Sequence, residues 1–265
     1  MLPPFFDQVE ELKDLSPIIA WAMFIVACLI VLVALVSVTI SIYLAIKYVT
    51  YNRRYNSKFL TGRDAARKIL DNNGLSHIKV STFGSFLFGN SYSHYFKKVR
   101  LRRLTADKAT VTSLAMGAQK AGLAILDKDN DPDMKTRIYL TPLIYFGPVA
   151  FIPLILVGVV IDIILFNFTG VVTLILTGVG LLFYVVSFVL SIMVLKTEVK
   201  AQKKAIEVLR RDDLATEEEL GMMEELYRLY NIQYINDIIM EFLQMILRIL
   251  QFIAKIQSSS SSSSK

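Results

Sequence analysis

The feature that most constrains this chain is a long run without a charged side chain, from Leu15 to Ile46. About 20 consecutive apolar residues are enough for a helix to cross the hydrocarbon core of a bilayer. This run is longer, so its helix is expected to tilt or to continue past the membrane surface. We therefore predict a first membrane-spanning helix over about 18–46, in a segment that extends over 18–49.

Two further uncharged runs follow, from Ile138 to Ile161 and from Val171 to Leu195. We predict that they form a transmembrane helical hairpin over 138–195, with a turn at 167–170 and Asp162 near its tip. Prolines in the first of these runs predict a kink rather than a break, because neighbouring helices can satisfy the freed carbonyls. Hydrophobic residues make up 54% of the chain, which agrees with several spans.

The C-terminal segment 233–256 has a helical period but carries four charges, Asp237, Glu241, Arg248 and Lys255. They recur after four, seven and seven residues, so they share one stripe of a helix. Charges at bilayer depth usually face other protein. The segment is therefore either a fourth span or an amphipathic helix on the membrane surface. The serine-rich tail, 257–265, is predicted to be disordered.

Basic residues crowd just beyond the first and third predicted spans. They place a domain at 50–137 and helices at 196–232 on the cytoplasmic side, or on the matrix side of a mitochondrial membrane. The N-terminal segment 1–17 is acidic, which is unlike a signal peptide or presequence. Membrane topology thus explains the net charge of +6, and we expect no nucleic-acid partner.

Within the membrane-side domain, residues 61–75 predict an amphipathic helix. Thr61 can cap its start, Asp64 completes an approximate capping box, and Gly74 can take the left-handed position at its end. Residues 77–83 and 95–101 alternate like strands, and we predict that they pair as a small β-hairpin.

The helix at 61–75 reads T-G-R-D-A-A-R-K-I-L-D-N-N-G-L. This resembles the T-G-x-x-x-A-r-x-i-L-d-x-n-G-L signature of the YugP-type membrane-bound neutral zinc metallopeptidases. The resemblance covers about residues 50–235. It implies a zinc-binding helix, which in that family reads roughly A-A-H-E-V-G-H-A-I-Q.

The positions that match this zinc helix are 117–126, where neither histidine nor the glutamate is present. The resemblance places Gln119, Lys120 and Leu123 at the positions of the first ligand, the general base and the second ligand. Its third ligand corresponds to Glu198. One carboxylate cannot hold a catalytic zinc, which needs about three protein ligands. We therefore expect no catalytic residue, no metal and no cofactor, and a chain that is not an enzyme.

Two interpretations of 107–127 remain open. The plainer one is a packed helix. The sharper one is an ion pair between Lys120 and Glu198 that fills the vacated metal site, because a lone buried charge would be costly. The family's D-H-Y-D-P segment, which helps to shape its active site, corresponds here to 90–94 and keeps only Tyr92.

Other metal sites are not favoured by the sequence. Cys28 is the single cysteine, which excludes a zinc site built from cysteines within one chain. Residues 127–133 resemble the start of a calcium loop, but Pro132 and Ile138 occupy its glycine and glutamate positions. We interpret this segment as an acidic turn.

A basic cluster lies within and just after the predicted strand at 95–101. It consists of Lys97, Lys98, Arg100, Arg102 and Arg103. It is either a solvated strand edge or a site for anionic lipid headgroups. The sequence does not decide between the two.

We therefore predict a mainly α, polytopic membrane protein with three or four transmembrane helices and a small membrane-side helical domain containing one β-hairpin. Its expected role is that of a catalytically inactive accessory or structural subunit of a larger inner-membrane assembly, one version being a respiratory or ATP-synthesising complex. Expected partners are lipids and other membrane subunits, in a mitochondrial inner or bacterial cytoplasmic membrane. The alternatives are a non-cleaving substrate-binding regulator of an active protease, a transport component, and an enzyme with a metal borrowed from a partner.

Overall fold

The structure, a computed structural model, describes residues 16–166 and 170–262, and for residues 87–88, 141–150 and 258–262 the backbone only. Residues 1–15 of the predicted N-terminal segment and residues 167–169 of the predicted turn therefore lie outside the described residues. The chain divides into two compact units. The first unit comprises residues 1–38, 140–192 and 236–265, and the second comprises 39–139 and 193–235.

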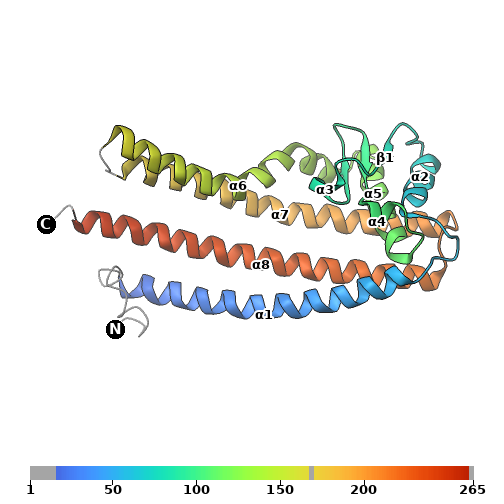
Figure 1. Cartoon of the computed structure of the whole chain (residues 1–265), viewed down its shortest axis with the longest axis horizontal. Helices are drawn as coiled ribbons and strands as arrows, with labels where there is room; N and C mark the ends of the chain where they lie inside the picture. Colours follow the sequence, from blue (N-terminus) through green and yellow to red (C-terminus); the bar gives the residue numbers. More distant parts are fainter. Residues whose placement is uncertain (1–15, 167–169, 263–265) are drawn as a thin grey trace. The chain divides into compact units, whose positions relative to one another are not determined.

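Four long helices dominate the described residues: α1 (Pro17–Arg53), α6 (Pro132–Leu165), α7 (Val171–Arg211) and α8 (Glu217–Ser262) (Figure 1). Of these, α1 and α7 are long and apolar enough to cross a membrane, whereas the described apolar stretch of α6 is shorter. Each predicted span is the apolar part of a longer helix, because the charged residues that flank it continue the helical backbone. The protein is thus mainly helical with two candidate spans.

In the first unit, α8 packs along α7 in the antiparallel direction. The rings of Phe242 and Phe188 lie 5.5 Å apart between centroids. Ten residues further along α8, Phe252 would lie 3.4 Å from a Cβ added to Gly178 of α7. Ala254 packs against the region of Ala20 on α1. Residues 242–254 of α8 therefore lie beside the apolar parts of both candidate spans.

The charged stripe predicted on α8 is divided by this packing. Arg248 lies over the rings of Phe151 and Tyr184, with its Cζ atom 4.5 and 4.8 Å from their centroids. Glu241 is hydrogen-bonded to Ser191 of α7. Asp237 is instead exposed. Gln244 and Gln251, which follow it at intervals of seven residues, are exposed as well. The inner stripe thus faces α6 and α7, and a second polar stripe remains on the surface.

Asp162 near the end of α6 fastens the hairpin. Its carboxylate accepts hydrogen bonds from the backbone N–H groups of Val172 and Thr173, at 3.2 and 2.7 Å, and from the Thr173 hydroxyl at 2.6 Å. The first N–H groups of a helix lack partners inside the helix. Asp162 therefore supplies the acceptors that the start of α7 needs, which explains a carboxylate in an otherwise apolar hairpin.

The core of the second unit forms around α2 (Gly62–Asn72) and α5 (Val111–Lys128). Thr61 and Asp64 make the predicted capping box, with both reciprocal hydrogen bonds present. Gly74 has a φ of +70°, and the N–H groups of Gly74 and Leu75 donate to the carbonyls of Asp71 and Leu70. This is a Schellman motif, and both predicted ends of the helix are confirmed.

Two glycines let α2 and α5 approach closely. A Cβ atom added to Gly117 would lie 2.3 Å from the carbonyl oxygen of Gly62, and one added to Gly62 would lie 2.3 Å from that of Thr105 in α4 (Arg103–Ala106). These neighbours are backbone atoms, which cannot rotate away as a flexible side chain can. Glycine at both positions is therefore a requirement of the helix crossing.

The sheet has three short strands, β1 (Lys79–Ser81), β2 (Ser91–Ser93) and β3 (Lys98–Arg100), in the order β1-β3-β2. The predicted pairing of 77–83 with 95–101 as a hairpin is wrong, because β1 and β3 are parallel. The intervening residues form α3 (Ser85–Phe88) and β2, and this crossover brings the chain back in the same direction. The hairpin is formed by β2 and β3, which are antiparallel.

In the serine-rich tail, predicted to be disordered over 257–265, residues 257–262 continue the backbone of α8, and 263–265 lie outside the described residues. The reason is that an established helix can extend one hydrogen bond at a time at little cost, so residues of modest helix propensity can continue it.

Candidate functional site

A group of charged side chains gathers in the second unit, where α5, α6 and α7 meet. Gln119 and Lys120 come from α5, Arg137 from α6 and Glu198 from α7. A close helix approach brings them together, since a Cβ added to Gly122 would lie 2.5 Å from the carbonyl oxygen of Ala201. Because Gly122 and Ala201 are within one turn of Lys120 and Glu198, their contact sets the distance between the two charges.

Both oxygens of the Glu198 carboxylate are occupied by nitrogen donors. Lys120 Nζ lies 2.9 Å and Gln119 Nε2 2.8 Å from Oε2, while an Arg137 nitrogen lies 2.6 Å from Oε1. The side chains of Lys120, Arg137 and Glu198 are only 12, 20 and 15% exposed. The predicted ion pair between Lys120 and Glu198 is confirmed. We call these four residues the Glu198 cluster.

Glu198 lies beyond the apolar part of α7, and its pKa reflects two opposing effects. Burial raises the pKa of its carboxyl, but the charges of Lys120 and Arg137 and their hydrogen bonds outweigh burial and hold the pKa at about 2. The carboxyl is therefore ionised at neutral pH and engaged by cations. It cannot take up a proton there as a general base would.

This pKa predicts how the stability of the second unit depends on pH. The folded carboxyl has a lower pKa than the usual 4.5, so it adds stability above about pH 4.5 that is lost as the pH falls through 2. We expect the difference in unfolding free energy between the natural chain and Glu198→Gln to shrink by roughly 3 kcal/mol across that window. Unfolding in detergent at several pH values measures it, and a difference that stays constant with pH would contradict the assignment.

The residues at the family's ligand positions do not fit zinc. Zinc binds thiolate, imidazole and carboxylate ligands, and only Glu198 among Gln119, Leu123 and Glu198 is of these types. Both oxygens of Glu198 already face cationic donors, which would repel a metal ion. Leu123 has no donor atom and is buried beside Met134 and Ala201. Within the described ranges, no group of three or more metal-binding side chains was found elsewhere.

Arg137 is the member of the cluster that sequence reasoning missed. It also donates to the Thr197 hydroxyl at 2.9 Å. Its position was a usable signal, because it is the last charged residue before the second uncharged run. In the structure this cation bonds to Thr197 and Glu198 of the neighbouring helix α7.

A second polar cluster joins α5 to the β2–β3 hairpin. The Asp127 carboxylate accepts a hydrogen bond from the Tyr92 hydroxyl at 2.6 Å and contacts His94 Nδ1 at 2.7 Å. Burial and the bond to Asp127 raise the pKa of Tyr92 well above its usual range. The single family residue kept in 90–94 therefore fastens the hairpin to α5.

The acidic turn at 127–133 begins α6. Asp131 Oδ1 accepts hydrogen bonds from the N–H groups of Asp133 and Met134, both at 3.0 Å, as a helix N-cap does. Lys200 Nζ lies 2.6 Å from both Asp131 and Asp133. The turn thus serves a capping and ion-pairing role, which agrees with its interpretation from sequence.

The residues of the predicted basic cluster lie on several neighbouring elements of the second unit. Lys98 and Arg100 lie on the sheet, whereas Lys97 lies at the hairpin turn, 3.8 Å from Asp127. Arg102 precedes α4, and Arg103 in its first turn is 3.7 Å from Asp107. Lys98 and Arg100, two residues apart on β3, lie on the same face of the sheet.

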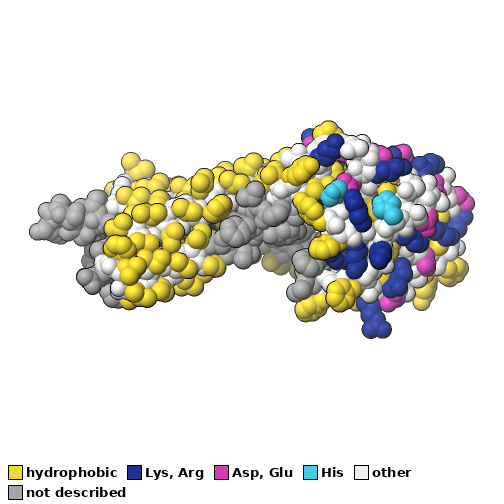
Figure 2. Space-filling model, turned by 90° about the horizontal axis from the view of Figure 1, so that it is seen from above, with side chains coloured by type: hydrophobic (Ala, Val, Ile, Leu, Met, Phe, Trp, Pro, Cys, Tyr) yellow, Lys and Arg dark blue, Asp and Glu magenta, His cyan; other side chains and the backbone are white. Residues whose placement is uncertain are grey.

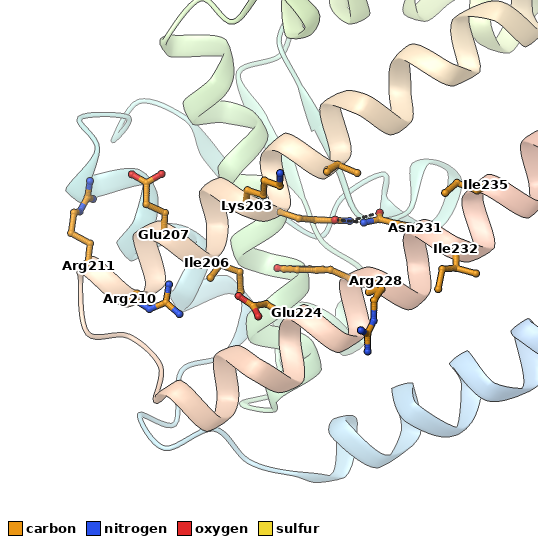
Figure 3. A pocket seen from close by; sticks show the side chains of 13 residues that line it. Lys203, Ile206, Glu207, Arg210, Arg211, Glu224, Arg228, Asn231, Ile232 and Ile235 are labelled. Atoms are coloured by element: carbon orange, nitrogen blue, oxygen red, sulfur yellow. Dashed lines mark hydrogen bonds between the residues drawn. The ribbon is translucent and has the colours of Figure 1, made fainter.

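A hollow of about 740 Å³ lies between α7 and α8 in the second unit (Figure 3). Gln202 and Asn231 cross it with two reciprocal amide hydrogen bonds of 3.0 and 2.7 Å. Ile206, Ile232 and Ile235 form apolar parts of its wall, and its rim carries both signs of charge. None of the residues of the Glu198 cluster lines it.

A sequence model of the family described as "Putative neutral zinc metallopeptidase" matches residues 25–253. The chain belongs to this family. The match confirms the resemblance drawn from the helix at 61–75. It contradicts the expectation that the chain is not an enzyme, because the family assignment points to a zinc metallopeptidase. No curated protein and no solved structure matches the chain.

The family match and the side chains at the ligand positions test different parts of the chain. The family assignment rests on most of the chain, whereas our expectation rested on three side chains in one helix. The poor fit of those side chains to zinc concerns only the ligand positions Gln119, Leu123 and Glu198.

Proposed function

We propose that this family member is a polytopic membrane protein that acts as an accessory subunit of a larger membrane assembly. The membrane location is supported by α1, which leaves large apolar side chains such as Ile25, Leu32 and Leu35 more than 40% exposed. Hydrophobic side chains also dominate the visible surface of the first unit, and Lys and Arg gather on the second (Figure 2). The apolar surface of the first unit would be unfavourable in water but not in lipid.

The observation that carries the assembly role is the exposed polar stripe of α8, formed by Asp237, Gln244 and Gln251. Residues 242–254 of α8 lie beside the apolar parts of α1 and α7. If those helices span the membrane, the amides of Gln244 and Gln251 are at bilayer depth. Lipid tails cannot hydrogen-bond an amide, so such side chains face protein in membrane bundles.

The partner that fits this stripe is a membrane-spanning helix with its own hydrogen-bonding side chains. Gln244 and Gln251 are seven residues apart, which is the repeat of side chains that face one neighbouring helix in a left-handed pair. A buried amide lies next to the stripe in sequence, since Asn236 precedes Asp237. Its side chain is 6% exposed, and its Nδ2 atom has no partner among the described residues.

The test is the double substitution Gln244→Leu and Gln251→Leu. We expect the amount of partner that copurifies from native membranes in mild detergent to fall about tenfold, since two interhelical hydrogen bonds in a membrane are together worth roughly 1–3 kcal/mol. The unfolding temperature of the isolated chain should not fall, because both side chains are exposed.

The matched control is Ile239→Leu with Ile253→Leu, two exposed apolar positions on the same helix. It should leave copurification unchanged. Recovery of the natural chain from native membranes as a lone monomer would refute the assembly role. A peptidase assay on the same preparation addresses the activity to which the family points.

The location proposed for this assembly is an inner membrane, mitochondrial or bacterial, with the second unit on the matrix or cytoplasmic side. The support is the basic residues that follow the apolar parts of α1 and α7, including Arg53, Arg54 and Lys196. Protease protection of an epitope tag in the second unit, measured in oriented vesicles, tests the side. A respiratory or ATP-synthesising complex as the host stays a prediction, and cofractionation tests it.

A further inference from the structure

The three-stranded sheet of the second unit presents a cationic face. Val80 and Val99 turn inward, where they pack with the core around α2 and α5. Side chains alternate along a strand, so the neighbouring residues Lys79, Lys98 and Arg100 lie on the opposite face. Ser81 and Ser93 are half-buried at other positions of these strands, whereas the hydroxyl of Ser91 is buried and has no hydrogen-bond partner among the described residues. This face therefore carries cations and no carboxylate of its own.

The strand register places two of these cations side by side. Lys79 and Lys98 are direct partners in the parallel pair of β1 and β3. Like charges at such positions destabilise a sheet. Neither lysine belongs to an ion pair among the described residues. The arrangement would be stabilised by an anion bound between them.

A cavity of about 410 Å³ lies at this place, lined by both lysines together with Arg63, Asp64 and Arg67 of α2. The α2 side chains already have partners in the second unit. Arg63 pairs with Asp107 at 3.1 Å, Arg67 with Asp71 at 2.7 Å, and Asp64 accepts from Thr61. Lys79 and Lys98 are thus the charges left to meet a ligand.

Exposed phenylalanines lie in the segments that connect the strands of this sheet. Phe83, Phe86 and Phe96 are 82, 95 and 73% exposed. Lys98 Nζ lies 5.4 Å from the ring centroid of Phe83, and Arg100 Cζ lies 5.4 Å from that of Phe96. Hydrophobic side chains are visible among Lys and Arg side chains on this unit (Figure 2). Three large apolar side chains exposed beside cations are a costly surface in water.

We propose that this face binds anionic phospholipid at the membrane surface. Lys79 and Lys98 contact the phosphate of the headgroup in the cavity, and Phe83, Phe86 and Phe96 enter the interfacial layer. Basic residues near an anionic leaflet and aromatic rings at headgroup depth are the two interactions that hold a protein surface on a bilayer. The inference rests on the membrane location proposed above but not on the partner subunit.

A single-stranded nucleic acid is the other polyanion that uses cations and aromatic rings. Sheet proteins that bind it stack bases on aromatic side chains of the strands themselves. Here Lys and Arg occupy the outward strand positions, and the three phenylalanines lie in the segments that connect the strands. The geometry favours a lipid surface.

The test uses the full chain in nanodiscs with bromine on the lipid tails, which quenches nearby tryptophan. Trp21 is the only tryptophan, so its quenching in the natural chain reports whether α1 lies in the bilayer. In a Trp21→Phe background, Phe86→Trp reports whether the sheet face meets lipid. We expect strong quenching of Phe86→Trp when the nanodisc contains anionic phospholipid and weak quenching when it contains only phosphatidylcholine.

Adding Lys79→Gln and Lys98→Gln should lower the equilibrium constant for docking about 30-fold in anionic nanodiscs, because each basic residue at such a surface is worth about fivefold. The control reporter is Tyr55→Trp in the same background, at an aromatic position that is 68% exposed and outside the sheet face. It should stay unquenched in both lipids. Unchanged unfolding temperatures show that the lysine variants fold.

Several outcomes would overturn the inference. If Phe86→Trp is quenched equally in both lipids, or in neither while Trp21 is quenched, the sheet face does not bind anionic lipid. If 10 mM inorganic phosphate abolishes the difference, the cavity binds a free phosphate rather than a bilayer. If a single-stranded RNA oligonucleotide binds with the same dependence on Lys79 and Lys98, and lipid has no effect, the ligand is nucleic acid. Absence of Trp21 quenching would instead refute the membrane location.

Discussion

Replacing Glu198 with leucine is expected to destabilise the second unit by about 3–5 kcal/mol, because Lys120 and Arg137 would stay largely buried without their carboxylate. The same cost does not arise for Lys120→Met, since Arg137 still pairs with Glu198. Thermal or denaturant unfolding in detergent, followed by circular dichroism, measures both variants.

The decisive companion is the triple variant Lys120→Met, Arg137→Met and Glu198→Leu. Replacing all members of a buried ion cluster by apolar side chains of similar volume is often neutral or stabilising. We expect it to recover most of the stability lost in Glu198→Leu. A triple variant no more stable than the single one would show that the cluster's charges are not what couples α5, α6 and α7.

The second large effect is expected at the crossing of α2 and α5. Gly117→Val should destabilise the protein by at least about 3 kcal/mol or prevent folding, because the new Cβ would meet the Gly62 carbonyl oxygen at 2.3 Å. The helices can only separate to relieve this contact, and that would open the core. Expression level and unfolding temperature in detergent report the result.

Gly221 provides a matched control of opposite sign. It also lies in a helix, but a Cβ added there would meet nothing within 4 Å. Gly221→Ala should therefore stabilise α8 by roughly 0.5–1 kcal/mol, as alanine does in an exposed helix interior. Equal effects of Gly117→Val and Gly221→Ala would mean that close backbone approach is not what glycine provides at position 117.

Features carried by local sequence were predictable. Thr61, Asp64 and Gly74 define both ends of α2 through hydrogen bonds within a few residues, so the motif alone located that helix. The apolar runs likewise predicted the apolar parts of α1 and α7, the two candidate membrane spans. The ion pair of Lys120 and Glu198 was also reached, but only through the family resemblance, because the two residues lie 78 positions apart.

Features that depend on distant pairing were not predictable. The alternation of 77–83 and 95–101 indicated strands, but it carries no information on whether two strands run parallel. The place of Arg137 in the Glu198 cluster was not predicted, because it depends on how α6 packs against α7. The division of the α8 charges into an inner and an exposed stripe likewise depends on where α6 and α7 lie.

The second unit is discontinuous in sequence, and this has a consequence for biogenesis. Its two pieces, 39–139 and 193–235, are separated by the hairpin of the first unit. Lys120 leaves the ribosome long before Glu198, so α5 carries an unmatched cation until the hairpin has been made. Folding of the domain therefore waits for synthesis of the hairpin, and a nascent chain stalled before residue 193 should be a substrate for quality-control proteases.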